Sequence, residues 1–254
     1  MRDEILYEVR GSAAWLTIDR EERRNAVGVA ALEMLLRHLD RAEADAAVRA
    51  LCLTGAGREV FCAGADLADA GADAGSLPAS YARVLKRLRA FPKPLVARVN
   101  GHCLAGGLGL MLSCDVIYAR DGIHVGAPEV TVGLFPMMAA ALLLRDGLRK
   151  KVLELVYTGG RMTAQEAEAA GLVTRIFPEA ELDAAVSGVL ERVARSAPRA
   201  VELGRRALAE AEGLPFVEAV DLLCARLGDV LRTEDAAEGL RAFLEKRAPR
   251  WKGR

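Results

Sequence analysis

Residues 101–115, GHCLAGGLGLMLSCD, combine a glycine-rich turn with the apolar spacing of a buried helix. Glycine inside a helix costs roughly 1 kcal/mol relative to alanine, so Gly106, Gly107 and Gly109 are unfavourable choices for a packed helix. One interpretation is that this helix lies close against a neighbouring strand. The other is that a helix start without side chains lets a ligand reach unpaired N–H groups, where the helix dipole favours negative charge.

A second turn of small residues follows an earlier strand in the same way. The strand predicted at 49–54 leads to the segment FCAGADL, in which Gly64 and Ala65 offer backbone N–H groups. Two strand-to-helix turns from adjacent units can each direct one donor at a single oxygen, which is the geometry of an oxyanion hole. The pattern predicts such a site without naming its substrate.

The rest of the chain alternates strand and helix patterns. A hairpin is predicted at 5–9 and 13–18, helices at 29–45, 80–90 and 106–113, and strands at 95–100, 116–119 and near 124–125. We expect a mobile surface segment at 70–78, a capping box at Thr163 and Glu166, and helices almost throughout from Leu182 onward. These repeats predict an α/β core over 1–195 and a helical region over 196–254 for subunit contacts.

Charge and composition exclude several classes of function. The chain has 35 Lys and Arg against 35 Asp and Glu, so no net field recruits nucleic acid or an anionic membrane. Its longest uncharged run, 99–114, is shorter than a bilayer span, and the N-terminus lacks the apolar stretch of a signal peptide, which predicts a cytoplasmic protein. The five cysteines and three histidines lack metal-site spacing, so we expect buried reduced thiols and no metal. Among the histidines, only His102 lies near the glycines and is a candidate for substrate contact.

Six ordered segments carry a resemblance to a known family. They are GAGREVFCAGADL, KPLVARVNGHCLAGGLGL, CDVIYA, APEVTVGLFP, TAQEAEAAGLV and AFLEKRAPRWKGR. Together they resemble the crotonase (enoyl-CoA hydratase/isomerase) superfamily over nearly the whole chain. The resemblance implies a crotonase-like fold of repeated ββα turns with a helical C-terminal region that trimerises, often into a dimer of trimers. It also implies an acyl-CoA thioester as substrate, with no separate cofactor because CoA is part of that substrate.

The resemblance also implies roles for individual residues. By position, Ala65 and Gly106 match the two residues whose backbone N–H groups bind the thioester oxygen and stabilise an enolate. Phe243 and Lys246 match residues that reach CoA across a subunit contact, although Lys246 is equally an exposed helix lysine. The full set implied in substrate or CoA binding is Arg23, Arg24, Ala63, Asp66, Leu67, Leu104, Gly107, Phe243 and Lys246. Within this set, we expect Asp66 to be structural or to lie beside CoA, and not to carry a proton.

The carboxylates distinguish two reactions of the family. Its hydratases carry two glutamates, because hydration adds both a hydroxyl and a proton. This chain keeps Glu129, in the segment APE, but has Gly109 at the other position and no acid between residues 100 and 114. A 1,3-proton shift needs one carboxylate, which takes a proton beside the thioester carbonyl and returns it two carbons along. The resemblance therefore favours double-bond isomerisation with Glu129 as the proton shuttle, and we expect burial to raise the pKa of Glu129.

Several alternatives stay open at this point. Hydration would use Glu129 with an unidentified second group, for which Asp69 and Glu59 are candidates, while Asp115 is expected to hold a helix end. Another enolate reaction, such as C–C cleavage or thioester hydrolysis, is a further alternative, as is an acyl-CoA-binding protein with little catalysis. Met137 and Met138 stand where many hydratases have a glycine-rich run. They line an acyl pocket or belong to the core, and the core is the favoured interpretation.

Overall fold

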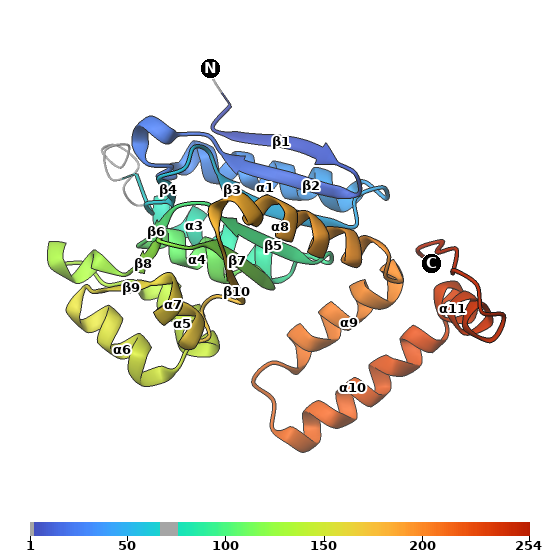
Figure 1. Cartoon of the computed structure of the whole chain (residues 1–254). Coiled ribbons are helices and arrows are strands. Elements are labelled where there is room, and N and C mark those ends of the chain that lie inside the picture. The colour runs from blue at the N-terminus through green and yellow to red at the C-terminus, as the bar shows by residue number, and fades with distance from the viewer. Residues whose placement is uncertain (1–2, 67–75) are drawn as a thin grey trace.

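The computed structural model describes residues 3–66 and 76–254 of the chain (Figure 1). Leu67, Asp69 and most of the surface segment expected at 70–78 lie outside the described residues. The last three residues of that segment, 76–78, begin helix α3 (Ser76–Arg89), so the prediction of a loop was wrong there.

The larger sheet has the spatial order β1-β2-β3-β5-β7-β10. Its strands are β1 (Ile5–Arg10), β2 (Ala13–Ile18), β3 (Ala50–Gly55), β5 (Leu95–Val99), β7 (Val116–Arg120) and β10 (Arg175–Phe177). The pair β1 and β2 is antiparallel, as the predicted hairpin requires, and the other pairs are parallel. The first five strands were predicted to within one residue at each end, and all six residues of β3 are buried. Strand β10, three residues long, was not predicted.

A smaller sheet, in the order β4-β6-β8-β9, lies beside the larger one. Its strands are β4 (Val60–Cys62), β6 (His102–Leu104), β8 (His124–Gly126) and β9 (Arg161–Thr163), each three residues long. The sequence predicted only β8 among them, because three residues are too few to show a two-residue period. The chain passes from β3 to β4, from β5 to β6 and from β7 to β8, which confirms the implied repeated ββα units.

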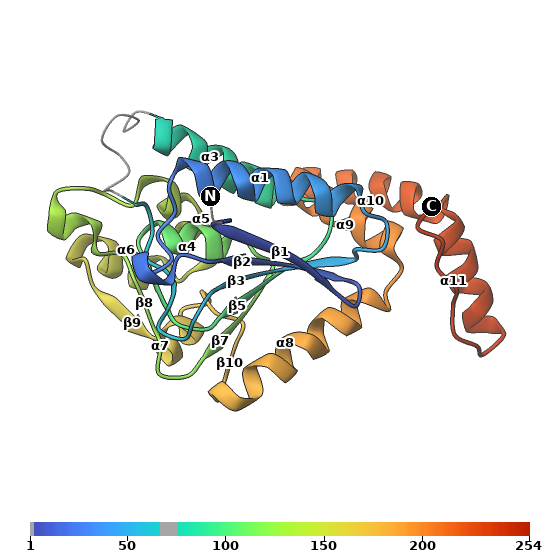
Figure 2. The same ribbon diagram turned by 90° about the horizontal axis from the view of Figure 1, so that it is seen from above.

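Helices cover both faces of the larger sheet. Figure 2 shows α1 (Val29–Ala44) and α3 on one face and α8 (Glu179–Ala194) on the other. In α1 the residues at helical spacing, Leu32, Leu35 and Leu39, are buried as their pattern predicted. Helix α4 (Gly106–Leu112) follows β6 and is buried in the core between α3 and α5 (Met137–Asp146).

Further helices flank the smaller sheet. They are η2 (Pro128–Val132), α6 (Arg149–Thr158) and α7 (Ala164–Ala169). The predicted capping box is confirmed at α7: the Glu166 N–H donates to the Thr163 hydroxyl at 3.2 Å, and the Glu166 carboxylate accepts from the Thr163 N–H at 2.8 Å. Helix α6 was not predicted.

Three C-terminal helices extend away from the sheets (Figure 1). They are α9 (Pro198–Ala211), α10 (Phe216–Leu231) and α11 (Glu234–Leu244). Large apolar side chains are exposed along them, namely Leu208, Phe216, Val217, Val220, Leu227, Leu231, Leu240, Phe243 and Leu244. Such an uncovered apolar surface marks an interaction site more often than a solvated one, in keeping with the predicted use of this region for subunit contacts.

Within residues 3–66 and 76–254, no helix is long and apolar enough to cross a membrane. The same ranges hold no group of His, Cys, Asp and Glu side chains that could bind a metal ion. Four of the free cysteines, Cys52, Cys62, Cys103 and Cys114, are buried, whereas Cys224 is exposed on α10, so the expectation of a buried thiol was wrong for that residue.

Candidate active site

The first turn of the predicted oxyanion hole is held beside the segment 24–27. The Ala63 N–H donates to the carbonyl oxygen of Arg24 at 3.1 Å, and the Asp66 N–H donates to that of Val27 at 3.0 Å. The carbonyl oxygen of Gly64 in turn accepts from the Val27 N–H at 2.8 Å. The N–H groups of Ala63 and Asp66 are thus bonded, whereas the N–H of Ala65 has no acceptor in the described part of the chain.

The second turn begins helix α4. The Ala105 N–H donates to the carbonyl oxygen of Gly126 at 2.8 Å, which ties the end of β6 to the end of β8. Ala105 has φ 51° and ψ −129°, a strained conformation for a residue with a Cβ. A strained conformation of this kind persists only where surrounding bonds impose it. At Ala105 it turns the chain at the end of β6, so that α4 begins at Gly106. Among the described residues, the Gly106 N–H also has no hydrogen-bond acceptor.

The two turns meet at Gly64 and Gly106. A Cβ placed on Gly64, whose φ is +98°, would lie 2.8 Å from the Gly106 nitrogen. A Cβ placed on Gly106 would lie 3.6 Å from the Ala65 nitrogen. Two unbonded N–H groups from adjacent units are therefore neighbours, and this arrangement can stabilise negative charge that develops on a carbonyl oxygen.

The glycines of α4 differ in whether the surrounding packing requires a residue without a side chain. A Cβ at Gly107 would overlap the carbonyl oxygen of Cys62 in β4, so close packing accounts for this residue. A Cβ at Gly106 would meet nothing closer than 3.5 Å, so packing alone does not require glycine there. Both interpretations of the glycine-rich stretch thus apply, each to its own residue, and a substrate contact at Gly107 stays a prediction.

Glu129 lies in η2, three residues after Gly126, whose carbonyl binds the second turn. Its side chain is half-buried, and in the described part of the chain the buried Oε2 atom has no hydrogen-bond partner. Burial raises the pKa of Glu129 above its ordinary value, as expected. A carboxylate with one unpartnered oxygen and a raised pKa is suited to take up and return a proton.

Tyr81, on α3, was missed by the sequence analysis. A Cβ at Gly109 would overlap the Tyr81 hydroxyl and would lie 3.1 Å from its Cζ atom. The same hydroxyl donates a hydrogen bond to the carbonyl oxygen of Gly106. Burial raises the pKa of Tyr81 well above its ordinary value, and the charge of Glu129 adds to this shift. Helical spacing marks Tyr81 as buried, but no local signal pairs it with a residue 28 positions later.

The residues predicted to contact CoA near the first turn have mixed environments. Arg23 and Arg24 are exposed at η1 (Glu21–Arg23) and its end, and Ala63 pairs with Arg24 through the backbone. Asp66 is buried and forms an ion pair with Arg20 at 3.0 Å, which supports its structural alternative. On the second turn, the half-buried Leu104 pairs with Gly126 in the parallel strands β6 and β8.

Helix α11, which carries Phe243 and is followed closely by Lys246, lies at the opposite end of the molecule from β4 and β6 (Figures 1 and 2). Phe243 is 80% exposed at the end of α11, and Lys246 is also exposed. One chain therefore does not bring them to the site, and their contact with CoA stays a prediction that needs a second subunit.

Other candidates have structural partners. The His102 Nδ1 atom accepts from the His124 N–H at 2.9 Å, which joins β6 to β8. Asp115 accepts from the Leu95 N–H at 2.8 Å and pairs with Arg205, so it holds β5 and α9 rather than a helix end. Glu59 is exposed.

The two methionines at the start of α5 differ in their environments. Met137 is 71% exposed, so the core interpretation was wrong for it, while Met138 is half-buried against the core.

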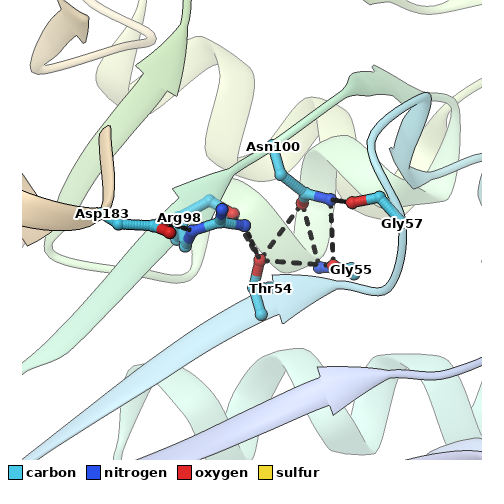
Figure 3. Close-up of polar contacts among 6 residues, drawn as sticks. All are labelled: Thr54, Gly55, Gly57, Arg98, Asn100 and Asp183. Carbon is cyan, nitrogen blue, oxygen red and sulfur yellow. Dashed lines mark hydrogen bonds and ion pairs between the residues drawn. The ribbon is translucent and has the colours of Figure 1, made fainter. Parts of the chain in front are cut away.

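Asn100 joins the turns that follow β3 and β5 (Figure 3). Its Nδ2 group donates to the carbonyl oxygens of Gly55 at 2.9 Å and Gly57 at 2.8 Å, and its Oδ1 atom accepts from the Thr54 hydroxyl at 3.1 Å. Arg98 donates to Thr54 and pairs with Asp183 of α8 at 2.6 Å. The cluster fixes the two units from which the turns of the site arise.

Comparison with known proteins places these features in a family. The family model described as enoyl-CoA hydratase/isomerase matches residues 8–254. A putative enoyl-CoA hydratase of Thermus thermophilus is 36% identical over 249 residues, which cover 95% of this chain and 98% of that protein. A 2,3-dehydroadipyl-CoA hydratase of Escherichia coli is 35% identical and covers 99% of each chain. The crystal structure of an enoyl-CoA hydratase from Bacillus anthracis superposes with a TM-score of 0.94 at 30% identity, over 99% of this chain and 100% of that one.

Proposed function

The chain belongs to the enoyl-CoA hydratase/isomerase family, and we propose that it is an isomerase that moves the double bond of an enoyl-CoA thioester from position 3 to position 2. It is an enzyme of the crotonase superfamily with the crotonase fold. The proposal concerns which reaction of the family it catalyses.

In the proposed reaction Glu129 is the only proton carrier. Its carboxylate takes a proton from C2, and the released electron pair moves into the thioester carbonyl to form an enolate. The Ala65 and Gly106 N–H groups donate to the enolate oxygen, and each such donor is worth roughly 3–4 kcal/mol in comparable sites. Glu129 then returns the proton to C4 as the double bond forms between C2 and C3, so no atom is gained or lost.

The observation that carries this proposal is the arrangement at Gly109. Hydration needs a second group to hold water or deliver a proton, and a side chain at residue 109 would collide with the buried Tyr81. Glu129 is meanwhile half-buried with an unpartnered oxygen, which fits a group that exchanges a proton with substrate.

Hydration is the second candidate, because the relatives reported above are named as hydratases. In that reaction the water oxygen bonds to C3 and C2 gains a proton. Glu129 would act with a group that is not identified among the described residues.

The test incubates the protein separately with a 3-enoyl-CoA and a 2-enoyl-CoA in D₂O and follows products by mass spectrometry. We expect conversion of the 3-enoyl ester without formation of 3-hydroxyacyl-CoA. Glu129→Gln should lower the rate by about 10²- to 10⁴-fold, as loss of an acid/base group does. Glu168→Gln, at an exposed position of α7, is the matched control and should leave it unchanged. Rapid formation of 3-hydroxyacyl-CoA would establish hydration instead.

We also propose that the protein assembles as a homotrimer or a dimer of trimers and works in the cytoplasm on its acyl-CoA substrate. The exposed apolar residues of α9–α11 support the assembly, since they would be covered by a second copy. Light scattering would measure the mass in solution, and Phe243→Asp should weaken the assembly if α11 forms the contact.

A further inference from the structure

We propose that Tyr81 determines which reaction this site performs, by filling the place from which a second acid would act on water. This inference rests on the proposed function and adds to it a residue outside the motifs of the two turns. Tyr81 acts here as a specificity-determining and positioning residue, and it takes no part in proton transfer.

The first step of the argument is steric. Gly106 and Gly109 lie three residues apart in α4 and therefore on the same face of the helix. A side chain at residue 109 would extend next to the turn that carries the Gly106 N–H. The hydroxyl and Cζ of Tyr81, together with Leu85 Cδ1 at 3.3 Å, occupy the space that this side chain would need, so Tyr81 requires glycine at 109.

The second step concerns the hydroxyl hydrogen. A tyrosine hydroxyl has one hydrogen to donate, and that of Tyr81 is donated to the carbonyl oxygen of Gly106. It is therefore not available to protonate substrate carbon or to orient water. Because its pKa is raised well above the ordinary value, the phenol also stays neutral near neutral pH and cannot serve as a base there.

The third step concerns how firmly Tyr81 is held. It belongs to the buried face of α3 with Leu77, Val84 and Leu88. On the other side of the helix Arg87 pairs with Asp40 of α1 at 3.0 Å, and Arg83 pairs with Glu33 at 2.5 Å. The ring is thus fixed by a packed helix pair, and its bond to Gly106 braces the first turn of α4, where the Gly106 N–H must point at the substrate oxygen.

The consequence is a choice of reaction. Hydration bonds a water oxygen to C3 and adds a proton to C2, so it needs a polar group beside the enolate to hold the water. With Tyr81 in that place, the enolate formed from a 3-enoyl ester either regains its proton at C2, which restores the substrate, or receives at C4 the proton that Glu129 holds, which gives the 2-enoyl product.

The experiment compares four variants: Tyr81→Phe, Gly109→Glu, Tyr81→Ala/Gly109→Glu and its matched control Tyr81→Ala/Gly109→Gln. For each, circular dichroism reports folding, and two assays report isomerisation of a 3-enoyl-CoA and hydration of a 2-enoyl-CoA. We expect Tyr81→Ala/Gly109→Glu to hydrate at least about 10²-fold faster than its Gln control, since it gains an acid/base group. Gly109→Glu alone should gain no hydration, because the glutamate has no room.

Tyr81→Phe isolates the hydroxyl while keeping the ring. We expect kcat for isomerisation to fall about fivefold to tenfold and KM to change little, because the hydrogen bond to the Gly106 carbonyl oxygen is lost. Hydration should stay absent, because the phenylalanine ring still fills the space beside Gly109. An unchanged kcat overturns the positioning role, including in the case where the double variant does not fold. Equal hydration by the folded Glu and Gln double variants, or a gain by Gly109→Glu alone, overturns the steric role.

The outcomes for the two proposals are distinguishable. Fast hydration by the unmodified protein refutes both the proposed isomerase and the exclusion of water by Tyr81, and a loss of that hydration in Tyr81→Phe would identify Tyr81 as the missing acid. Isomerisation without hydration by the unmodified protein, together with equal hydration by the folded Glu and Gln double variants, refutes the inference about Tyr81 alone.

Discussion

The side-chain amide of Asn100 pairs with both backbone polar groups of Gly55, accepting from its N–H at 3.2 Å and donating to its carbonyl oxygen at 2.9 Å. Gly55 is the last residue of β3, and Asn100 is the first residue after β5. The Asn100 side chain therefore continues the hydrogen bonding between these two parallel strands past the end of β5. Each of these strands leads into one turn of the candidate oxyanion hole. The relative placement of the two N–H donors therefore depends on this buried amide.

The replacement Asn100→Ala should destabilise the protein by about 1–3 kcal/mol, because buried N–H and C=O groups of the β3 turn lose their partner. The isosteric Asn100→Asp keeps an acceptor for the Gly55 N–H but places a negatively charged carboxylate against the carbonyl oxygens of Gly55 and Gly57. We therefore expect it to lower the free energy of unfolding by at least as much. Urea unfolding monitored by fluorescence measures both. If Asn100→Ala were less stable and Asn100→Asp as stable as the parent protein, the volume of the side chain, and not its two donated hydrogen bonds, would account for the effect.

The buried ion pair between Arg20 and Asp66 predicts a larger effect. Their side chains are 8% and 6% exposed, and Arg20 also donates to the carbonyl oxygen of Ala26 at 2.7 Å, next to the first turn of the site. Removing one member of a buried pair costs roughly 3–5 kcal/mol, and Arg20 keeps a second carboxylate, Glu4, at 3.1 Å. Asp66→Ala should therefore lower stability by about 3 kcal/mol, the lower end of that range, and reduce activity. The exposed pair Arg10 and Glu8 offers the control, since solvent screens it and Glu8→Ala should cost far less stability than Asp66→Ala. Equal losses for the two variants in urea unfolding would contradict this assignment.

The sequence predicted the elements whose signal is local. Apolar runs of four to six residues indicated five of the strands of the larger sheet but not the three-residue β10, and the Thr163 capping box marked the start of α7. The three-residue strands β4, β6 and β9 were not predicted because their hydrogen-bond partners are distant in sequence and their segments are rich in glycine or polar residues. The smaller sheet is a product of tertiary pairing.

The candidate site divides in the same way. The turns of Ala65 and Gly106 were predicted from small residues after strands and from the family resemblance, and Glu129 from the resemblance. Tyr81 was not predicted, because helical periodicity indicates that a residue is buried but not what it contacts. The exposure of Met137 was also missed, since an apolar run at a helix start looks the same whether it lines a core or a surface.

The bidentate contact of the Arg205 guanidinium with Asp115 predicts a stability effect that is specific to arginine. Its Nε and Nη2 atoms each lie 2.9 Å from one oxygen of Asp115, and Nη1 donates to the carbonyl oxygen of Arg89 at 3.2 Å. Lysine cannot reproduce this planar arrangement, so Arg205→Lys should cost about 1–3 kcal/mol and speed hydrogen exchange in α9. The neighbouring Arg206→Lys keeps a charge beside Glu202 on the exposed face and should change neither quantity. Identical exchange in both variants would refute the role of Arg205 in holding α9.

Glu129 predicts opposite effects on stability and activity, each with its own dependence on pH. Its pKa is raised by burial in the folded state, so the native protein binds its proton more tightly than the unfolded chain does. The resulting penalty is absent below the unfolded-state pKa and develops as pH rises through the raised folded-state pKa. Glu129→Gln should therefore have a higher Tm than the parent protein at neutral pH, with the difference shrinking toward zero in acid.

The parent's kcat/KM should fall as pH drops through the same raised pKa, because the carboxylate must be ionised to take a proton. Thermal unfolding and kcat/KM measured across pH 4–8 test both trends, and a lower Tm for Glu129→Gln at neutral pH would mean that the ionised carboxylate has a stabilising partner.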